Sequence, residues 1–220
     1  LRKPYFLIIN ILTPFIISFA SYGIKFHYDA GAYHLNFQNW LNNYKITVGL
    51  ANLNPYYSYG SIQEYIYANF YQYDFNLVIS FFELLFFAAL FNYLLMNLIN
   101  PINKFLKTSS LFIFLFLFLD NFGYLGGGNG SIQIQMPGKP DTAVGILMLL
   151  VALLVLNDLK RNETDNFNFL LIITMSLFSF QLKSNAAFLI LLLLIYIYRF
   201  KSVIKFFIWP NLIILLFFLM

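Results

Sequence analysis

Asp29 and Asp141 are the residues whose type and position most favour proton-transfer chemistry. Asp29 opens the stretch DAGAYHLNFQNWLNNY (29–44), and Asp141 follows Pro140 at the start of an apolar run. A carboxylate held at the beginning of a rigid helix can accept a proton from a hydroxyl group or bind a metal ion. Each residue also stands where a helix is expected to begin, so it can instead only stabilise the first turn. The sequence leaves both roles open.

Tyr33, His34 and Glu64 are candidates for binding a substrate near Asp29. His34 follows Asp29 by five residues, which is roughly 140° around an α-helix, so the spacing predicts no Asp–His dyad. The chain has only 2 histidines, without HxxxH or HxxE spacing, and therefore no histidine-based zinc site is predicted. The ordinary alternative for His34 is a solvated or hydrogen-bonded ring, and Glu64 can simply be solvated.

Lys139 and Lys183 are candidates for neutralising a phosphate group. Lys139 ends a glycine-rich connection directly before Pro140, and Lys183 is the only charged residue between Asn166 and Arg199. A lysine at the depth of lipid headgroups can contact a phosphate. The alternative for Lys183 is that its amine only reaches water from the end of an apolar helix.

The composition indicates that these residues must be positioned in or on a membrane. Apolar residues make up 60% of the chain and charged residues 10%, against about 25% charged in an ordinary soluble protein. The net charge of +4 is scattered between apolar runs, so no nucleic-acid partner is predicted. Because there is no cysteine, disulfides and cysteine-ligated metals are excluded.

The apolar runs predict an all-α fold, a polytopic transmembrane helix bundle. None of them alternates with the period of a barrel strand, and they are long enough, or nearly so, to cross about 30 Å of hydrocarbon. The predicted spans are residues 5–22, 75–99, 110–125, 140–157, 167–182, 184–198 and 206–220. Because the chain starts at Leu1 and ends in an apolar run, we expect a fragment (1–220) of a longer transmembrane domain.

The distribution of lysine and arginine predicts that residues 23–74 form a long outer loop. With a cytoplasmic N-terminus, nine of these residues lie in inside connections and four outside. Within the loop, Tyr33, Phe37, Trp40, Leu41 and Tyr44 recur at helical spacing, which predicts an amphipathic helix on the membrane surface. The aromatic residues that follow suit the apolar faces of sugars, although anchoring at the interface explains them equally.

Three stretches of this sequence, YDAGAYHLNFQNWL, VGLANLN and KPDTAV, resemble the GT-C superfamily of multi-spanning membrane glycosyltransferases, in particular an uncharacterised bacterial branch. The resemblance implies a bacterial inner-membrane enzyme that takes a sugar from a polyprenyl-phosphate donor at the outer face. It implies that Asp29 acts as base or as ligand of a divalent metal ion, and that Asp141 is a second acidic site residue. The acceptor would be a cell-envelope glycan, a lipid or a protein.

We therefore predict an inverting glycosyltransferase in which Asp29 removes the proton of the acceptor hydroxyl. One alternative is a transporter or flippase, with Glu83 and an asparagine stripe lining a pathway. The other alternative is a glycan polymerase or ligase of a different membrane fold, although such proteins more typically have arginines in their outer loops.

Overall fold

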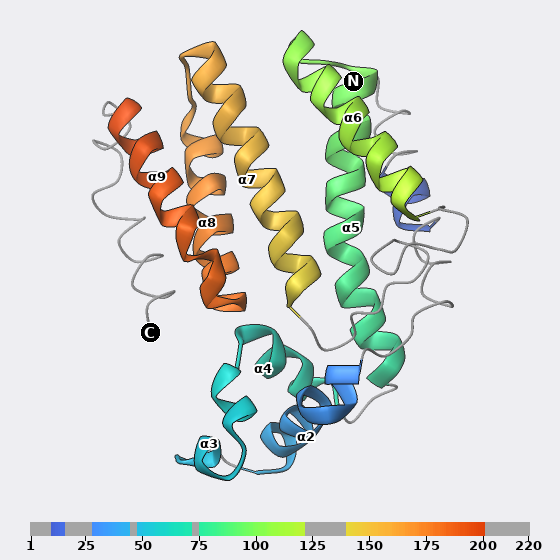
Figure 1. Cartoon of the computed structure of the whole chain (residues 1–220). Helices are drawn as coiled ribbons and strands as arrows, with labels where there is room; N and C mark the ends of the chain where they lie inside the picture. The colour runs from blue at the N-terminus through green and yellow to red at the C-terminus, as the bar shows by residue number, and fades with distance from the viewer. Residues whose placement is uncertain (1–9, 16–27, 45–47, 72–74, 122–139, 201–220) are drawn as a thin grey trace. The chain divides into compact units, whose positions relative to one another are not determined.

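The computed structural model of the chain describes residues 10–15, 28–44, 48–71, 75–121 and 140–200 (Figure 1). The elements in these residues are all helices, as expected for an all-α protein. The chain divides into two compact units, residues 1–142 and 143–220, and each is described by itself.

The first unit contains a group of short helices between residues 28 and 71. These are the π-helical turn η2 (Ala30–His34), α2 (Leu35–Asn43), α3 (Leu50–Leu53), the 3₁₀ turn η3 (Pro55–Tyr59) and α4 (Ile62–Asn69). Gly49 has a φ of 92°, a left-handed conformation that glycine adopts without steric cost, and it redirects the chain into α3. Asn54 then accepts a hydrogen bond from the backbone nitrogen of Tyr56 at 3.1 Å, which caps η3. α2 packs against α4.

The first unit also contains an antiparallel pair of longer helices, α5 (Phe75–Ile99) and α6 (Lys104–Asn121). α5 ends just before Pro101, because a proline cannot continue the helical hydrogen bonding. The side chain of Asn103 caps α6 by accepting from the backbone nitrogen of Leu106 at 2.8 Å. Leu90, Leu94 and Leu106 are almost fully buried in this pair.

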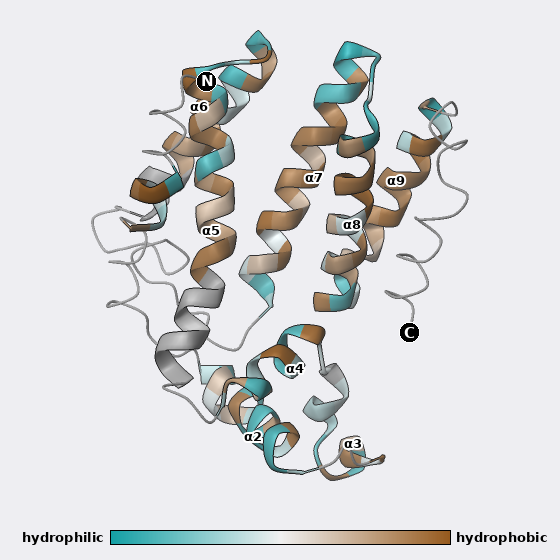
Figure 2. Cartoon of the chain, turned by 180° about the vertical axis from the view of Figure 1, so that it is seen from behind, coloured by the Kyte–Doolittle hydropathy of each residue, from teal (hydrophilic) through white to brown (hydrophobic). Residues whose placement is uncertain are grey.

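The second unit consists of most of α7 (Asp141–Arg161), followed by α8 (Asn166–Leu182), the 3₁₀ turn η5 (Ser184–Ala187) and α9 (Phe188–Arg199). Asp165 caps α8 by accepting from the backbone nitrogen of Asn168 at 2.7 Å. Figure 2 shows that these helices are hydrophobic along most of their length and hydrophilic where α7 turns into α8. Val151, Val155 and Ile172 form a fully buried part of the core.

The prediction of a polytopic transmembrane bundle is wrong. Among the residues whose side chains the structure describes, α7 is the one helix that is long and apolar enough to cross a membrane, and the part of α5 described in this way, Leu84–Ile99, is shorter. At about 1.5 Å per residue, the 17 residues of α8 and the 12 of α9 fall short of a hydrocarbon core of about 30 Å. The predicted span 184–198 is too short because it begins with η5, which the apolar composition does not distinguish from an α-helix.

α7 by itself is limited evidence for a membrane protein. Its most apolar window has a mean hydropathy of 2.3, yet 61% of that window is buried within the protein. Core helices of water-soluble proteins have the same length and composition. The predicted spans 5–22 and 206–220 lie outside the described residues, apart from the helical residues 10–15, and 110–125 is described only as far as residue 121.

Candidate functional site

The contact between α2 and α4 is lined by buried polar side chains, and we call it the polar seam. Its members are each at most 5% exposed and are His34, Gln38, Ser61, Gln63, Glu64 and Tyr67. Buried polar groups in proteins are normally hydrogen-bonded, because leaving one without a partner costs about 1–3 kcal/mol. The hydrogen-bond partners of these side chains therefore indicate the role of the polar seam.

Glu64 and His34 form the central pair of the polar seam. Oε1 of Glu64 lies 2.5 Å from Nδ1 of His34, although the two residues are 30 positions apart in the sequence. The other carboxylate oxygen, Oε2, accepts from the backbone nitrogen of Ser61 at 3.1 Å, as expected for a glutamate in the first turn of a helix. Both oxygens of Glu64 are thus engaged, and Glu64 orients the ring of His34. The solvated alternative for these residues does not hold, since both are buried.

Other polar atoms in the seam have no hydrogen-bond partner among the described residues. These are both ends of the Gln38 amide. Gln38 follows His34 by four residues, so the two side chains lie on the same face of the helix. The seam therefore presents hydrogen-bonding groups that the described part of the protein does not itself satisfy.

Tyr33 is a residue whose pKa is affected by three of the predicted acidic residues. Its ring stacks on Tyr56, with centroids 4.8 Å apart, and lies next to the ring of His34 at 4.2 Å. Burial raises the pKa of Tyr33 above its usual 10.0, and the negative charges of Asp29, Glu64 and Asp141 raise it further. The phenol is thus a neutral hydrogen-bond donor near pH 7. Three predicted site residues from separate stretches of sequence lie within electrostatic reach of it.

Asp29 does not cap the helix that follows it. Its backbone is already helical, with φ −63° and ψ −28°, and its side chain makes no capping hydrogen bond to η2. The capping alternative for Asp29 is therefore wrong. The carboxylate is half-buried.

The π-helical turn η2 changes the relation between Asp29 and His34. In η2 the backbone nitrogen of Leu35 donates to the oxygen of Ala30, five residues earlier. Residues five apart are neighbours in such a turn, so the 140° separation expected from an α-helix does not apply to Asp29 and His34. Phe37, on the predicted apolar face of α2, is buried, and Asn36 and Asn39 are exposed. Two residues depart from that pattern, since Gln38 is fully buried and Tyr44 is 62% exposed.

The remaining predicted site residues are not gathered at the seam. Asp141 is the first residue of α7, belongs to the first unit and contributes its charge to Tyr33. Lys139 lies outside the described residues. Lys183 belongs to the second unit, where its backbone nitrogen donates to the oxygen of Ser179 at 3.0 Å, and its phosphate-binding role stays a prediction.

The described residues contain no group of three or more histidine, aspartate or glutamate side chains that could bind a metal ion. The predicted role of Asp29 as a metal ligand consequently has no ligand set in the described residues to support it. Its role as a base needs only the carboxylate itself.

Comparison with known proteins identifies the family of the chain but not its activity. The model of a domain of unknown function, DUF8201, matches residues 1–220. This chain belongs to the DUF8201 family. No curated protein and no solved structure matches it. The function of this DUF8201 chain must therefore be argued from its own residues.

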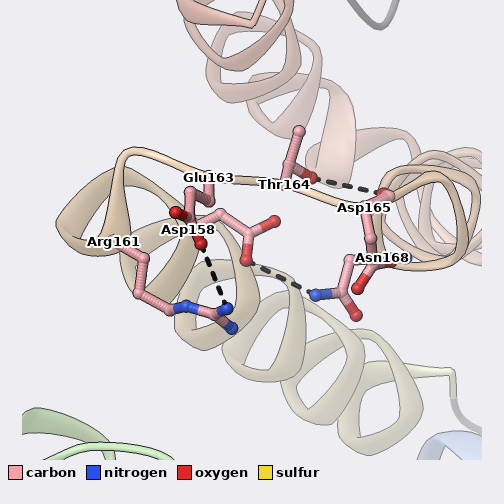
Figure 3. Close-up of a pocket in the computed structure, with 6 residues that line it drawn as sticks. All are labelled: Asp158, Arg161, Glu163, Thr164, Asp165 and Asn168. Atoms are coloured by element: carbon pink, nitrogen blue, oxygen red, sulfur yellow. Dashed lines mark hydrogen bonds and ion pairs between the residues drawn. The ribbon is translucent and has the colours of Figure 1, made fainter.

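The second unit of the DUF8201 chain contains a polar cluster that the sequence analysis missed. A pocket of about 100 Å³ lies where α7 turns into α8 (Figure 3), and its lining residues are Asp158, Arg161, Glu163, Thr164, Asp165 and Asn168. Asp158 is 1% exposed, and its Oδ2 accepts from the hydroxyl of Tyr196 at 2.6 Å, while its Oδ1 lies 3.4 Å from Nδ2 of Asn168.

These bonds connect α7, α8 and α9, and Arg199 adds a further one to Asn162 at 2.6 Å. The signal in the sequence was an aspartate, Asp158, at the polar end of an otherwise apolar helix. The partners satisfy the aspartate, so we assign the cluster a structural role.

Proposed function

We propose that this DUF8201 chain takes part in transferring a sugar from a polyprenyl-phosphate donor to a hydroxyl group, with Asp29 as the base. The observation that best supports this proposal is the buried pair of Glu64 and His34, 2.5 Å apart, beside the ring of Tyr33, whose pKa the charges of Asp29, Glu64 and Asp141 raise. Clusters of acidic groups beside a buried polar pair are typical of sites that move protons.

The three acidic residues have different proposed roles. Glu64 is occupied by His34 and Ser61 and serves to position the imidazole. Asp29 is half-buried, whereas Glu64 is almost fully buried, so an acceptor hydroxyl can reach the carboxylate of Asp29 more easily. Asp141 adds negative charge near Tyr33 and helps to keep the phenol protonated.

The reaction requires one proton transfer and one displacement. Asp29 accepts the proton of the acceptor hydroxyl as its oxygen forms a bond to the anomeric carbon. The bond between that carbon and the donor phosphate breaks, and the phosphate leaves with the electron pair. A single displacement inverts the configuration at the anomeric carbon.

Aromatic side chains of the first unit suit the sugar. Tyr33 and Tyr56 stack with an interplanar angle of 15°, and Phe37 stacks on Tyr57 at 5.4 Å. Such faces contact the C–H surfaces of a sugar ring, and the Tyr33 hydroxyl can donate to a sugar oxygen. The acceptor class, a glycan, lipid or protein of the cell envelope, belongs to the same proposal.

The lipid-linked donor places the reaction at the bacterial inner membrane. A polyprenyl chain stays in the bilayer, so the protein must reach the membrane surface. α7 is the described helix with the length and composition for a membrane anchor.

The proposal is tested by sugar transfer in membranes that contain the chain, using a radiolabelled polyprenyl-phosphate sugar. Asp29→Asn removes the proton acceptor at nearly constant shape and should lower transfer by about a hundredfold or more. Asp165→Asn is the matched control, because an asparagine can still cap α8 and this residue lies in the second unit. Wild-type transfer by Asp29→Asn would show that Asp29 is not the base.

A further inference from the structure

We propose that the polar seam binds a small amino alcohol, whose ammonium group and oxygen pair with the amide of Gln38. This inference goes beyond the proposed function, because the binding needs neither a lipid donor nor sugar transfer. The side chain of Gln38 is 0% exposed, and neither its Nε2 nor its Oε1 has a hydrogen-bond partner among the described residues. A buried amide without partners is costly, so an occupant that offers both a donor and an acceptor would stabilise the seam.

The residue that connects Gln38 to the rest of the site is His34. Gln38 follows His34 by four residues in helical conformation, and both side chains are buried where α2 packs against α4. Nδ1 of His34 lies 2.5 Å from Oε1 of Glu64, and its ring centroid lies 4.2 Å from that of Tyr33. The unmatched amide therefore stands within one helical turn of a buried carboxylate–imidazole pair and an aromatic ring.

The charges at this site favour a cationic ligand. Burial raises the pKa of Tyr33, and the negative charges of Asp29, Glu64 and Asp141 raise it further. These three carboxylates thus make the electrostatic potential at the phenol more negative. Neither lysine nor arginine occurs in the described part of the short helices between residues 28 and 71. A ligand with a positive charge is therefore favoured over a neutral or anionic one.

The amide of Gln38 selects a ligand with a donor and an acceptor close together. Its Oε1 accepts hydrogen bonds, and its Nε2 donates them. An ammonium group would donate to Oε1, and a neighbouring oxygen of the same ligand would accept from Nε2, so an amino alcohol matches both ends. The rings of Tyr33 and Tyr56, stacked with centroids 4.8 Å apart, add aromatic faces of the kind that attract ammonium groups.

The test measures binding of ethanolamine to the full chain in detergent micelles at pH 7 by titration calorimetry. Ethylene glycol, which lacks the ammonium group, and tetramethylammonium, which lacks N–H donors, should each bind at least tenfold more weakly than ethanolamine. Gln38→Met removes the amide at similar volume and should weaken ethanolamine binding at least tenfold. Asn39→Leu removes an amide from the exposed side of α2, and this matched control should bind ethanolamine like the wild type.

Thermal unfolding without ligand gives a second readout that separates a ligand site from a structural amide. An amide kept for a ligand is unmatched in the free protein, so Gln38→Met should raise the midpoint of unfolding by about 2–4 °C. An amide that is satisfied within the free protein would instead make Gln38→Met lower the midpoint.

A free amine and the ethanolamine headgroup of a phospholipid offer the same ammonium group. Weaker binding of added ethanolamine in nanodiscs of phosphatidylethanolamine than in nanodiscs of phosphatidylglycerol would assign the headgroup as the source. Equal binding in the two lipids would assign the free amine. Either result supports the proposed site.

Several results would overturn the inference. One is equal binding of ethanolamine by Gln38→Met and the wild type. Another is binding of ethylene glycol as tight as that of ethanolamine, which would reject a cationic ligand. No heat of binding together with a lowered midpoint in Gln38→Met would show that protein groups or a buried water satisfy the amide. If ethanolamine binding depends on Gln38 but sugar transfer does not depend on Asp29, the amino alcohol site stands and the proposed function fails.

Discussion

The pKa of Tyr33 depends on the charges of Asp29, Glu64 and Asp141. Because burial and the charges of Asp29, Glu64 and Asp141 raise the pKa of Tyr33, the folded protein retains this proton to a higher pH than the unfolded chain. A raised pKa in the folded state contributes stability below the usual pKa of 10.0, and this contribution disappears as the pH rises through the folded-state value.

We therefore expect Tyr33→Phe to reduce the loss of stability at alkaline pH. The midpoint of thermal unfolding, measured from pH 8 to pH 11, should fall less steeply above about pH 10 in this variant than in the wild type. The other tyrosines are unchanged, so the difference in slope reports Tyr33. Identical slopes would mean that Tyr33 is not embedded in the acidic group.

At the level of single residues, the sequence identified the acidic and aromatic components but not their pairing. Asp29, Tyr33, His34, Glu64 and Asp141 were all named as candidates by type and position. The pairing of His34 with Glu64 was not predictable, because it joins residues 30 apart and no local period encodes such a contact. Buried polar residues such as Gln38 were missed because apolar patterning carries no information about them.

At the scale of the elements, replacing glycine should have opposite effects on stability at two positions, one before α3 and one within α7. Gly49 precedes α3 in a left-handed conformation, where a Cβ would meet Nδ2 of Asn52 at 3.4 Å, an ordinary contact. The constraint at Gly49 is therefore conformational rather than one of space. Gly145 lies within α7, and nothing within 4 Å would meet an added Cβ.

Gly49→Ala should destabilise the first unit by about 1–2 kcal/mol, because a left-handed backbone is unfavourable for alanine. Gly145→Ala is the control with the same chemical change, and it should stabilise α7 by about 0.5–1 kcal/mol because alanine favours a helix. Denaturant unfolding in detergent, followed by circular dichroism, measures both. Equal effects in the same direction would contradict this account of Gly49.

Helix positions were more predictable than their role in a membrane. The apolar run 75–99 coincides with α5, and 167–182 differs from α8 by one residue, because long apolar runs bounded by polar residues strongly favour helices. What composition did not show was how much of each run is α-helical. η5 shortens the last of these helices, and η2 shifts the register at the start of α2.

For the whole molecule, the central question is whether α7 crosses a membrane and on which side its two ends would then lie. The basic residues at its C-terminal end, Lys160 and Arg161, favour the cytoplasm for that end. Single cysteines can decide this because the chain has none of its own.

We expect a cysteine at Asn43, exposed at the end of α2, to react with a membrane-impermeant maleimide in intact cells that lack an outer-membrane barrier. A cysteine at Glu163, whose side chain is 75% exposed beyond α7, should react only after the membrane is permeabilised. Labelling of both without permeabilisation, or recovery of the chain in the soluble fraction, would make α7 a core helix of a protein that does not cross the membrane.

The bonds between Asp158, Thr164 and Tyr196 also set an order of events during synthesis. Tyr196 leaves the ribosome 38 residues after Asp158, and Arg199 follows soon after it. These two residues provide the contacts that connect the turn between α7 and α8 to α9. Until they arrive, the buried carboxylate of Asp158 lacks its closest partner, which is costly in an apolar setting. The second unit therefore cannot complete these buried bonds before α9 is synthesised, and until then this part of the chain stays accessible to proteases and chaperones.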